Sequence, residues 1–396
     1  MRSSLPVLGL VVFLIAQPCH AITIQIDYTY DTPGFFATQA SRDRMSAAAV
    51  TLGDLLEDHL DAISPTGTDS WSAGFFHPSQ GGLQTIPNLV VPEDTVIVYV
   101  GGRSLGGSKL AETNVGLAFA SGSPEFQETA NSRGQGVTVG AGASDFGPWG
   151  ASISFSTTAS WNFEAALPAA GQYDFYSAAL HELGHALGFG TSDAWVTRVA
   201  NQAFQGADSV AEFGAPVPLS AGGDHWASGT TSFGSQAAMN ATIVSGLRRA
   251  LSPLDLAALS DIGWQVDVSG LSTGDLNFDG LVDISDLVKV ADAWLTPNLQ
   301  GDANHDRRVD IGDVTFIAEN WLNVVGPRQG SGLSSQPAVP EPSAIVLVAC
   351  GLVGSLAFYH RGAGFCRKRR VTGARVPGAK HFEPCCQVLP RADHKG

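Results

Sequence analysis

The N-terminal two thirds of the chain alternate between the hydrophobic patterns of strands and of helices. Apolar residues at every second position from Ile22 to Tyr30 predict a strand, and short apolar runs predict two more at 95–100 and 151–156. Gly101 and Gly102 close the second of these strands. Helical spacing of apolar residues covers 37–62, 173–189 and 253–262. Strands separated by helices predict an α/β (α+β) domain over 22–268 with a mixed sheet and a loop-rich stretch before about residue 250.

A second, smaller domain is predicted by an internal duplication. The segment Gly274–Asp283 recurs as Gly301–Asp310, 27 residues later, and each copy leads into an apolar helix. Two copies indicate a duplicated module rather than a solenoid, which needs three or more repeats. We therefore expect a small all-α domain over 274–325, followed by a Gly-, Ser- and Pro-rich linker over 326–338.

The first 21 residues have the pattern of a secretory signal peptide. Arg2 supplies the positive end, Val7–Ala16 the apolar stretch, and Ala21 a small residue at the cleavage point. The apolar stretch is too short for a good membrane-spanning helix. The pattern predicts an exported protein.

Charge is distributed unevenly along the chain. Of the 22 Lys and Arg, nine follow Tyr359 and one is Arg2, so residues 22–359 hold 12 basic residues against 35 of the 37 acidic ones, a net charge of −23. Such a balance argues against nucleic-acid binding, because few cations are present to neutralise phosphates. None of the five cysteines lies between residues 22 and 349, so the exported body has no disulfide framework.

The helical segment 173–189 carries a candidate catalytic motif, His181-Glu182-Leu183-Gly184-His185. Residues four apart lie about 40° apart around a helix, so both imidazoles can bind one zinc ion. Glu182 can reach a water on that ion as general base. The alternative is a structural helix with incidental histidines, but its apolar flanks predict burial, and buried His and Glu need polar partners.

The segment from His181 to Gly190 resembles the metzincin zinc metallopeptidases. That resemblance implies that Gly188 lets the chain leave the helix toward the metal. It also implies a third ligand three residues later, where this chain has Thr191, a poor zinc ligand. Asp193 is one candidate for the missing ligand, since carboxylate oxygen also binds zinc.

The other candidate for the third ligand is His225. In the leishmanolysin-like branch of the metzincins the third histidine follows an insertion and precedes Trp, and here His225-Trp226 lies forty residues beyond His185. The resemblance extends to Met239, as the methionine turn beneath the metal, and to Leu251–Trp264, as the closing helix. Taken alone, Met239 would be an ordinary core methionine. Residues 151–156 resemble the metzincin edge strand, which pairs with an extended peptide substrate.

These features predict a secreted zinc-dependent endopeptidase that hydrolyses peptide bonds through a zinc-activated water, with Glu182 as general base. The expected site comprises His181, His185 and His225 as ligands to one Zn²⁺, with Gly188 and Met239 in structural roles. The alternative function is a non-catalytic adhesion or scaffold protein of the cell envelope that works through its second domain. A zinc hydrolase acting on something other than peptides is a third possibility.

The duplicated segment has the spacing of calcium loops, with oxygen donors at positions 1, 3, 5, 9 and 12 and a backbone carbonyl at position 7. In the first copy these are Asp275, Asn277, Asp279, Leu281 (position 7), Asp283 and Asp286. In the second copy they are Asp302, Asn304, Asp306, Arg308 (position 7), Asp310 and Asp313. The sequence thus predicts one or two Ca²⁺ ions. Acidic turns without metal are the alternative, above all in the second copy, where Arg307 replaces the turn glycine.

Asp at position 12 in both loops makes this region similar to the dockerin module. The resemblance implies an EF-hand-like pair of repeats and a cohesin-like protein partner. Alternatively, calcium serves only to fold the module.

The C-terminal region combines Val339-Pro340-Glu341-Pro342 with an apolar run from Ala344 to Tyr359 and the basic cluster Arg367–Arg370. The run and its basic flank predict a membrane segment, and a buried hairpin is the alternative. Together, residues 339–370 resemble a PEP-CTERM sorting signal. That resemblance implies transient membrane anchoring, processing by an exosortase-type enzyme, and a final location in the cell envelope or outside the cell. Residues 371–396 are not assigned.

Overall fold

The computed structural model describes residues 21–232, 235–267, 274–276, 282–296, 301–304 and 308–321. The predicted linker, sorting segment, C-terminal tail and nearly all of the signal peptide lie outside the described residues. In the described part, the chain is a mixed α/β protein, as the sequence predicts.

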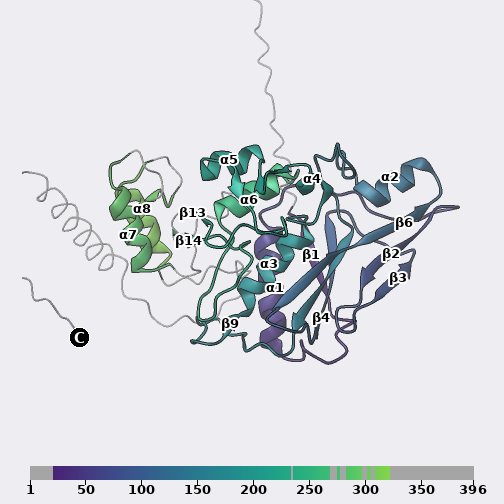
Figure 1. Ribbon diagram of the computed structural model, residues 1–396, viewed down its shortest axis with the longest axis horizontal. Helices are drawn as coiled ribbons and strands as arrows, with labels where there is room; N and C mark the ends of the chain where they lie inside the picture. The colour runs from purple at the N-terminus through teal and green to yellow at the C-terminus, as the bar shows by residue number, and fades with distance from the viewer. Residues whose placement is uncertain are drawn as a thin grey trace, which may run out of the picture.

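A four-stranded mixed sheet of order β1-β4-β7-β5 lies at the centre (Figure 1). Strands β1 (Thr23–Asp27), β4 (Thr95–Arg103) and β7 (Gly150–Ser156) are parallel, and β5 (Ala111–Val115) runs antiparallel to β7. The predicted strands at 22–30, 95–100 and 151–156 therefore exist. However, β4 continues through Gly101 and Gly102, which the sequence analysis placed after its end.

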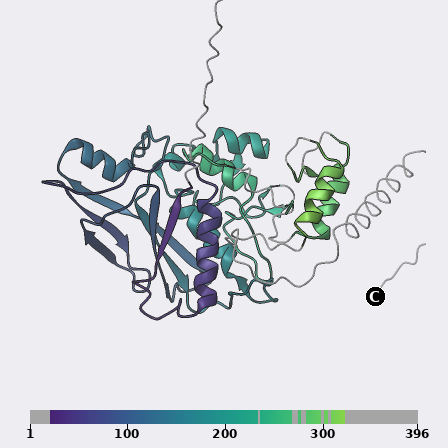
Figure 2. The ribbon, with the colours of Figure 1, turned by 180° about the vertical axis from the view of Figure 1, so that it is seen from behind.

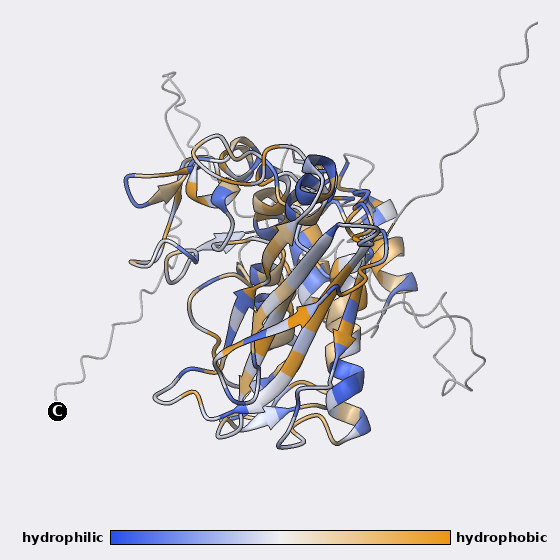
Figure 3. Cartoon of the chain, turned by 90° about the vertical axis from the view of Figure 1, so that its right-hand side faces the viewer, coloured by the Kyte–Doolittle hydropathy of each residue, from blue (hydrophilic) through white to orange (hydrophobic). Residues whose placement is uncertain are grey.

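The sheet is covered on both faces, because alternate side chains of β4 enter two different cores. Val96, Val98 and Val100 pack against the helices α1 (Gln39–Gly53) and α3 (Phe175–Ala186), which lie together on one face (Figures 1 and 2). Ile97 and Tyr99 pack on the other face, in a core that also holds Trp71, Phe75 and Trp149. Orange, hydrophobic positions accordingly run along the central strands in Figure 3.

The predicted helix 37–62 is too long, since α1 ends at Gly53. Leu55, Leu56 and Leu60 continue the apolar pattern beyond that residue, and all three are buried in the main core although their backbone is not helical. The apolar spacing of these leucines therefore reflects burial and not helical structure. Leu56 instead forms a bridge with Val266, which ties this segment to the end of the domain.

The prediction that residues 151–156 form the edge strand is wrong. Strand β7 is hydrogen-bonded to β4 on one side and to β5 on the other, so β5 is the edge at this end of the sheet. The physical reason is visible in burial: all seven residues of β7 are buried, whereas those of β5 are half-exposed.

The remaining elements of the first domain are short. Before α3 they are β2 (Ser70–Phe76), β3 (Leu83–Pro87), β6 (Leu117–Ser121), α2 (Pro124–Ser132), β8 (Trp161–Asn162) and β9 (Tyr173–Asp174). Strands β3, β2 and β6 form an antiparallel sheet. After α3 they are α4 (Asp193–Val196), β10 (Val199–Ala200), β11 (Ala203–Phe204), α5 (Ala207–Phe213), β12 (Val217–Pro218), β13 (Thr231–Ser232), β14 (Ser235–Gln236) and α6 (Pro253–Asp261).

The duplicated segment forms two helices, α7 (Ile284–Ala293) and α8 (Ile311–Glu319), which contact each other. They share a separate small core that includes Val290, Val314 and Ile317. Within the described residues, no helix has both the length and the apolar character needed to cross a membrane. The predicted membrane segment 344–359 lies outside that part of the chain.

Candidate metal centre

Helix α3 is fixed at its N-terminus by Asp174. The carboxylate of this residue accepts hydrogen bonds from the backbone N–H and the hydroxyl of Ser177, at 3.0 and 2.7 Å. Such an N-cap satisfies donors that a helix leaves unpaired. All 12 residues of the helix are buried, as its apolar flanks predict, and it is shorter than the predicted 173–189.

The chain leaves α3 through Gly188, whose φ of +100° strongly favours glycine. A Cβ at this position would lie 2.6 Å from the ring of Phe146. The turn brings the carbonyl oxygen of Phe189 back to within 2.7 Å of His185 Nδ1. Thr191 lies after the turn, where its hydroxyl donates to the carbonyl of His185 at 2.7 Å, so it closes the helix end.

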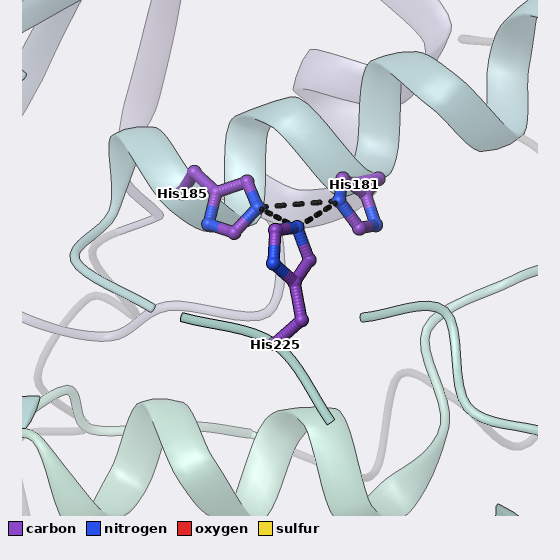
Figure 4. A group of neighbouring side chains, drawn as sticks. All are labelled: His181, His185 and His225. Atoms are coloured by element: carbon purple, nitrogen blue, oxygen red, sulfur yellow. Dashed lines mark hydrogen bonds between the residues drawn. The ribbon is translucent and has the colours of Figure 1, made fainter. Parts of the chain in front are cut away.

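Three histidines converge beside this helix, and we call His181, His185 and His225 the histidine cluster (Figure 4). Their Nε2 atoms are separated by 3.2 Å (181–185), 3.0 Å (185–225) and 3.1 Å (181–225). Among the described residues, this cluster is the group of three or more His, Cys, Asp and Glu whose atoms are placed to hold a metal ion. His225 thus reaches the motif helix from forty residues away.

The other ring nitrogen of each histidine has an acceptor of its own. His181 Nδ1 lies 2.8 Å from the carbonyl oxygen of Ala238, and His185 Nδ1 lies 2.7 Å from that of Phe189. His225 Nδ1 lies 2.8 Å from the Asp224 carboxylate. Because carbonyl and carboxylate oxygens only accept hydrogen bonds, each Nδ1 carries a proton and donates it. In the neutral rings the three Nε2 atoms therefore present lone pairs.

Three lone pairs pointing at one another repel unless a cation lies between them. Ligands held about 2.0–2.1 Å from a metal in tetrahedral geometry are about 3.3 Å apart, close to the separations observed here. Burial lowers the pKa of His181 and lowers that of His185 still further, which keeps both rings neutral, the form that binds metals. The donor set fits a metal ion.

Glu182 lies on the same helix and is buried with the cluster. Its Oε2 accepts a hydrogen bond of 2.7 Å from the hydroxyl of Thr113, which lies on the edge strand β5. Burial raises the pKa of the Glu182 carboxyl, while the neighbouring His181 imidazole and the hydrogen bond from the Thr113 hydroxyl act in the opposite direction. A carboxylate with a raised pKa beside a metal-capable cluster is suited to accept and return a proton.

Met239 lies directly beneath α3. A Cβ at Gly184 would come within 2.8 Å of the Met239 sulfur, so the glycine in the motif makes room for this side chain. The neighbouring Ala238 supplies the carbonyl that orients His181. Met239 therefore belongs to the floor of the histidine cluster.

The turn around Met239 is held by a buried carboxylate that the sequence analysis did not single out. Asp255, at the start of α6, accepts hydrogen bonds from Ala238 N (2.9 Å) and Met239 N (3.2 Å). It also accepts one from the indole N–H of Trp226 (2.9 Å), next to His225. Ser252 donates twice more, through its backbone and its hydroxyl. The Asp255 side chain thus holds both the segment that carries His225 and the turn that carries Met239.

Asp193, the competing candidate for the third ligand, does not lie in the cluster. Asp193 is the first residue of α4, and its carboxylate accepts a hydrogen bond of 2.6 Å from Gly140 N. His225 instead has Asp224 beside it. Burial alone would raise the pKa of the Asp224 carboxyl, but its hydrogen bonds, the one from His225 first among them, lower that pKa.

The predicted calcium ligands are only partly described. Asn277, Asp279, Leu281 and Asp306 lie outside the described residues. Asp283 and Asp310 are the N-caps of α7 and α8, each paired in a capping box with Asp286 or Asp313. Asp275 and Asp302, at position one, are buried, and Asn304 and Arg308 complete the described positions. The two copies therefore share one geometry at their helix starts.

Fold and site together define a mixed α/β protein with a cluster of two buried histidines and one half-buried histidine, next to a buried glutamate. No protein-family model, curated protein or solved structure matches the chain. The function is therefore inferred from the geometry of the site.

Proposed function

We propose that the chain is a zinc-dependent endopeptidase of the metzincin type. The observation that carries the proposal is the convergence of three Nε2 atoms at 3.0–3.2 Å, with every Nδ1 engaged elsewhere. Zinc suits three nitrogen ligands with one open position, which is the arrangement of catalytic rather than structural sites. Glu182 beside the cluster, the helix exit at Gly188 and Met239 next to Gly184 of α3 support the proposal, in which His225 takes the place of the ligand missing at Thr191.

In this proposal, His181, His185 and His225 would hold a zinc ion, which would supply Lewis-acid chemistry and a water whose pKa is lowered to about 7. Glu182 accepts a proton at its carboxylate and passes it to the departing amine. The Thr113 hydroxyl keeps that carboxylate in one orientation. The hydrogen bonds that the three Nδ1–H groups donate to Ala238 O, Phe189 O and the Asp224 carboxylate keep the imidazoles in the tautomer that the metal requires.

The position of β5 at the edge of the sheet favours a peptide as the substrate, rather than another class of molecule. It pairs only with β7 in the described part of the chain, so its other side offers backbone groups to an extended peptide. Thr113 lies in the middle of this strand and contacts Glu182. A peptide paired with β5 would therefore run past the catalytic carboxylate.

Glu182→Gln tests the proposal. It keeps the shape of the side chain but cannot accept the proton, so we expect zinc content near one ion per chain and loss of peptide cleavage. The control is Glu125→Gln on α2, an exposed glutamate, which should cleave like the unmodified chain. A Glu182→Gln protein that cleaves at the original rate would refute the mechanism.

The same assay separates the enzyme from its alternative. If the unmodified, zinc-loaded chain cleaves no peptide in a proteome-derived library, the non-catalytic envelope scaffold becomes the better explanation. Calcium binding by the duplicated module is a separate proposal, supported by the matching capping boxes of Asp283 and Asp310. It is tested by calcium titration of the chain, with D283N and D310N compared.

A further inference from the structure

Two consecutive arginines follow the methionine turn, and the first of them has a full set of partners. Arg248 forms a buried ion pair with Asp174, at 2.8 Å, and so holds the N-cap of α3. Its remaining donors reach the backbone carbonyls of Glu164, Ala165 and Ala166. Arg248 has a structural role that its contacts explain completely.

Arg249 does not have such a set. Its side chain is largely buried, with 8 % of the residue exposed, yet no carboxylate in the described part of the chain lies within ion-pair distance. Its Nη2 donates to the side-chain oxygen of Gln236, and its buried Nε has no partner. Arg133, also buried without an ion pair, differs because its guanidinium donates to five backbone carbonyls.

A buried arginine with unused donors is costly, because each unmet hydrogen bond loses its interaction with water. The cost is the more notable in a body that carries 35 acidic residues against 12 basic ones, where carboxylate partners are plentiful. Burial lowers the pKa of the Arg249 guanidinium, and the charge of Asp255 partly offsets this. However, Asp255 already accepts hydrogen bonds from Trp226, Ala238, Met239 and Ser252.

The position of Arg249 relates it to the histidine cluster. Its backbone N–H donates to the hydroxyl of Ser177 at 2.6 Å. Ser177 precedes His181 by one turn of α3, a distance of about 6 Å along the helix. Its guanidinium contacts Gln236, an exposed residue of β14 that lies three positions before Met239. Arg249 therefore contacts α3 one turn before the first histidine of the cluster, and its guanidinium contacts an exposed residue of the segment that leads to Met239.

We propose that Arg249 is a specificity-determining residue that binds a carboxylate of the peptide substrate close to the scissile bond. The inference rests on the proposed endopeptidase function and adds a substrate class to it. A guanidinium offers two parallel N–H donors to a carboxylate, and this pairing is strong where water is excluded. The carboxylate comes either from an Asp or Glu side chain or from the C-terminus of a peptide.

Matched peptides test the proposal on the zinc-loaded full chain. Starting from one cleaved sequence, internally quenched peptides carry Glu or Gln at each of three positions on either side of the cleaved bond. A second series carries a free or an amidated C-terminus. We expect kcat/KM to favour the charged member at one position by about tenfold or more, the value of a hydrogen bond to a charged group. The position that responds distinguishes a side chain from a terminus.

Variants then assign that preference to Arg249. In Arg249→Met the ratio between charged and neutral peptides should fall to about one, and Arg249→Lys should keep part of it. Arg248→Lys is the control and should keep the full ratio. The ratio is independent of the amount of folded protein, so a destabilised variant still gives an answer.

Two results would overturn the inference while leaving the endopeptidase intact. One is cleavage that is equally fast for charged and neutral peptides at every position and at the terminus. The other is a preference that persists in Arg249→Met. Failure of the unmodified chain to cleave any peptide would instead overturn the endopeptidase proposal, and this inference with it.

Discussion

The hydroxyl of Thr113 lies 2.7 Å from Oε2 of Glu182 and 3.0 Å from the backbone oxygen of the same residue. Thr113 belongs to the edge strand β5, and Glu182 belongs to the motif helix α3. The strand proposed to bind substrate and the proposed proton acceptor are thus joined directly.

Replacing Thr113 by Val should therefore impair turnover more than binding. The variant keeps the shape of the side chain but loses a hydrogen bond to a charged group, so we expect kcat to fall about tenfold with KM nearly unchanged. Thr113→Ser restores the hydroxyl and should recover most of the rate. Steady-state kinetics of the three proteins decide the question, and an unaltered kcat in the Val variant would contradict the prediction.

Asp255→Asn should weaken both the fold and the metal site. The amide nitrogen of Asn cannot accept hydrogen bonds, and the carboxylate it replaces accepts them from both segments flanking α3. We expect a loss of about 2–4 kcal/mol in the free energy of unfolding together with weaker zinc binding. Denaturant unfolding and a zinc titration measure the two effects.

Asp261→Asn provides a matched control for that experiment. Asp261 is a buried carboxylate of the same helix, but it accepts its hydrogen bonds from Asp208 N and Ser209 N on α5. It should therefore lower stability without changing zinc affinity. Equal zinc affinity in the Asp255 variant and the unmodified chain would show that the methionine turn does not need this support.

Zinc content should distinguish the two candidates for the third ligand. His225→Ala removes one of three converging nitrogens, so we expect it to lose most of the bound zinc. Asp193→Ala should keep about one zinc ion per chain, because that carboxylate binds Gly140 N away from the cluster. Elemental analysis after dialysis measures both, and zinc lost only from the Asp193 variant would reverse the assignment.

Asp58 should make stability depend on pH. Burial raises its pKa from 3.8 to about 6, opposed by a hydrogen bond from Gln265 N. The folded state therefore holds the proton more tightly than the unfolded state, and the associated stability is lost as pH rises through about 6. Asp58→Asn should raise the free energy of unfolding by about 1–2 kcal/mol at pH 7.5 and hardly at pH 4.

Asp54→Asn is the control, since it makes the same change of charge at an exposed residue. In this variant, the difference in the free energy of unfolding between pH 7.5 and pH 4 should equal that of the unmodified chain. A gain for Asp58→Asn that is equal at both pH values would show that ionisation is not the cause.

The sequence predicts those parts of the molecule whose pattern is local. The motif helix, the mixed α/β class and the exit at Gly188 all follow from spacing or from a single special residue. The same reasoning placed the end of α1 too late, because Leu55, Leu56 and Leu60 are buried without being helical. Apolar periodicity reports burial, and a buried loop reproduces it.

Contacts between distant segments escaped prediction. The edge position of β5 depends on strand order, which no periodicity reveals, and the resemblance to metzincins assigns the edge to residues 151–156 of β7 instead. Thr113 has ordinary sequence surroundings, and Asp255 is covered only as part of the closing helix that the resemblance implies. The roles of both residues come from pairing with residues 69 and 29 positions away. The adjacent arginines 248 and 249 were visible, but only the structure separates the paired one from the other.

The described residues of this protein include no cysteine, so no disulfide can connect distant segments among them. No cysteine lies between residues 22 and 349, while the histidine cluster brings residues 181 and 225 together at 3.1 Å. A metal ion there would cross-link these two segments in the way that a disulfide cross-links other proteins. The domain could then mature equally well in reducing and oxidising surroundings, and its durability would follow the supply of metal rather than the supply of oxidant.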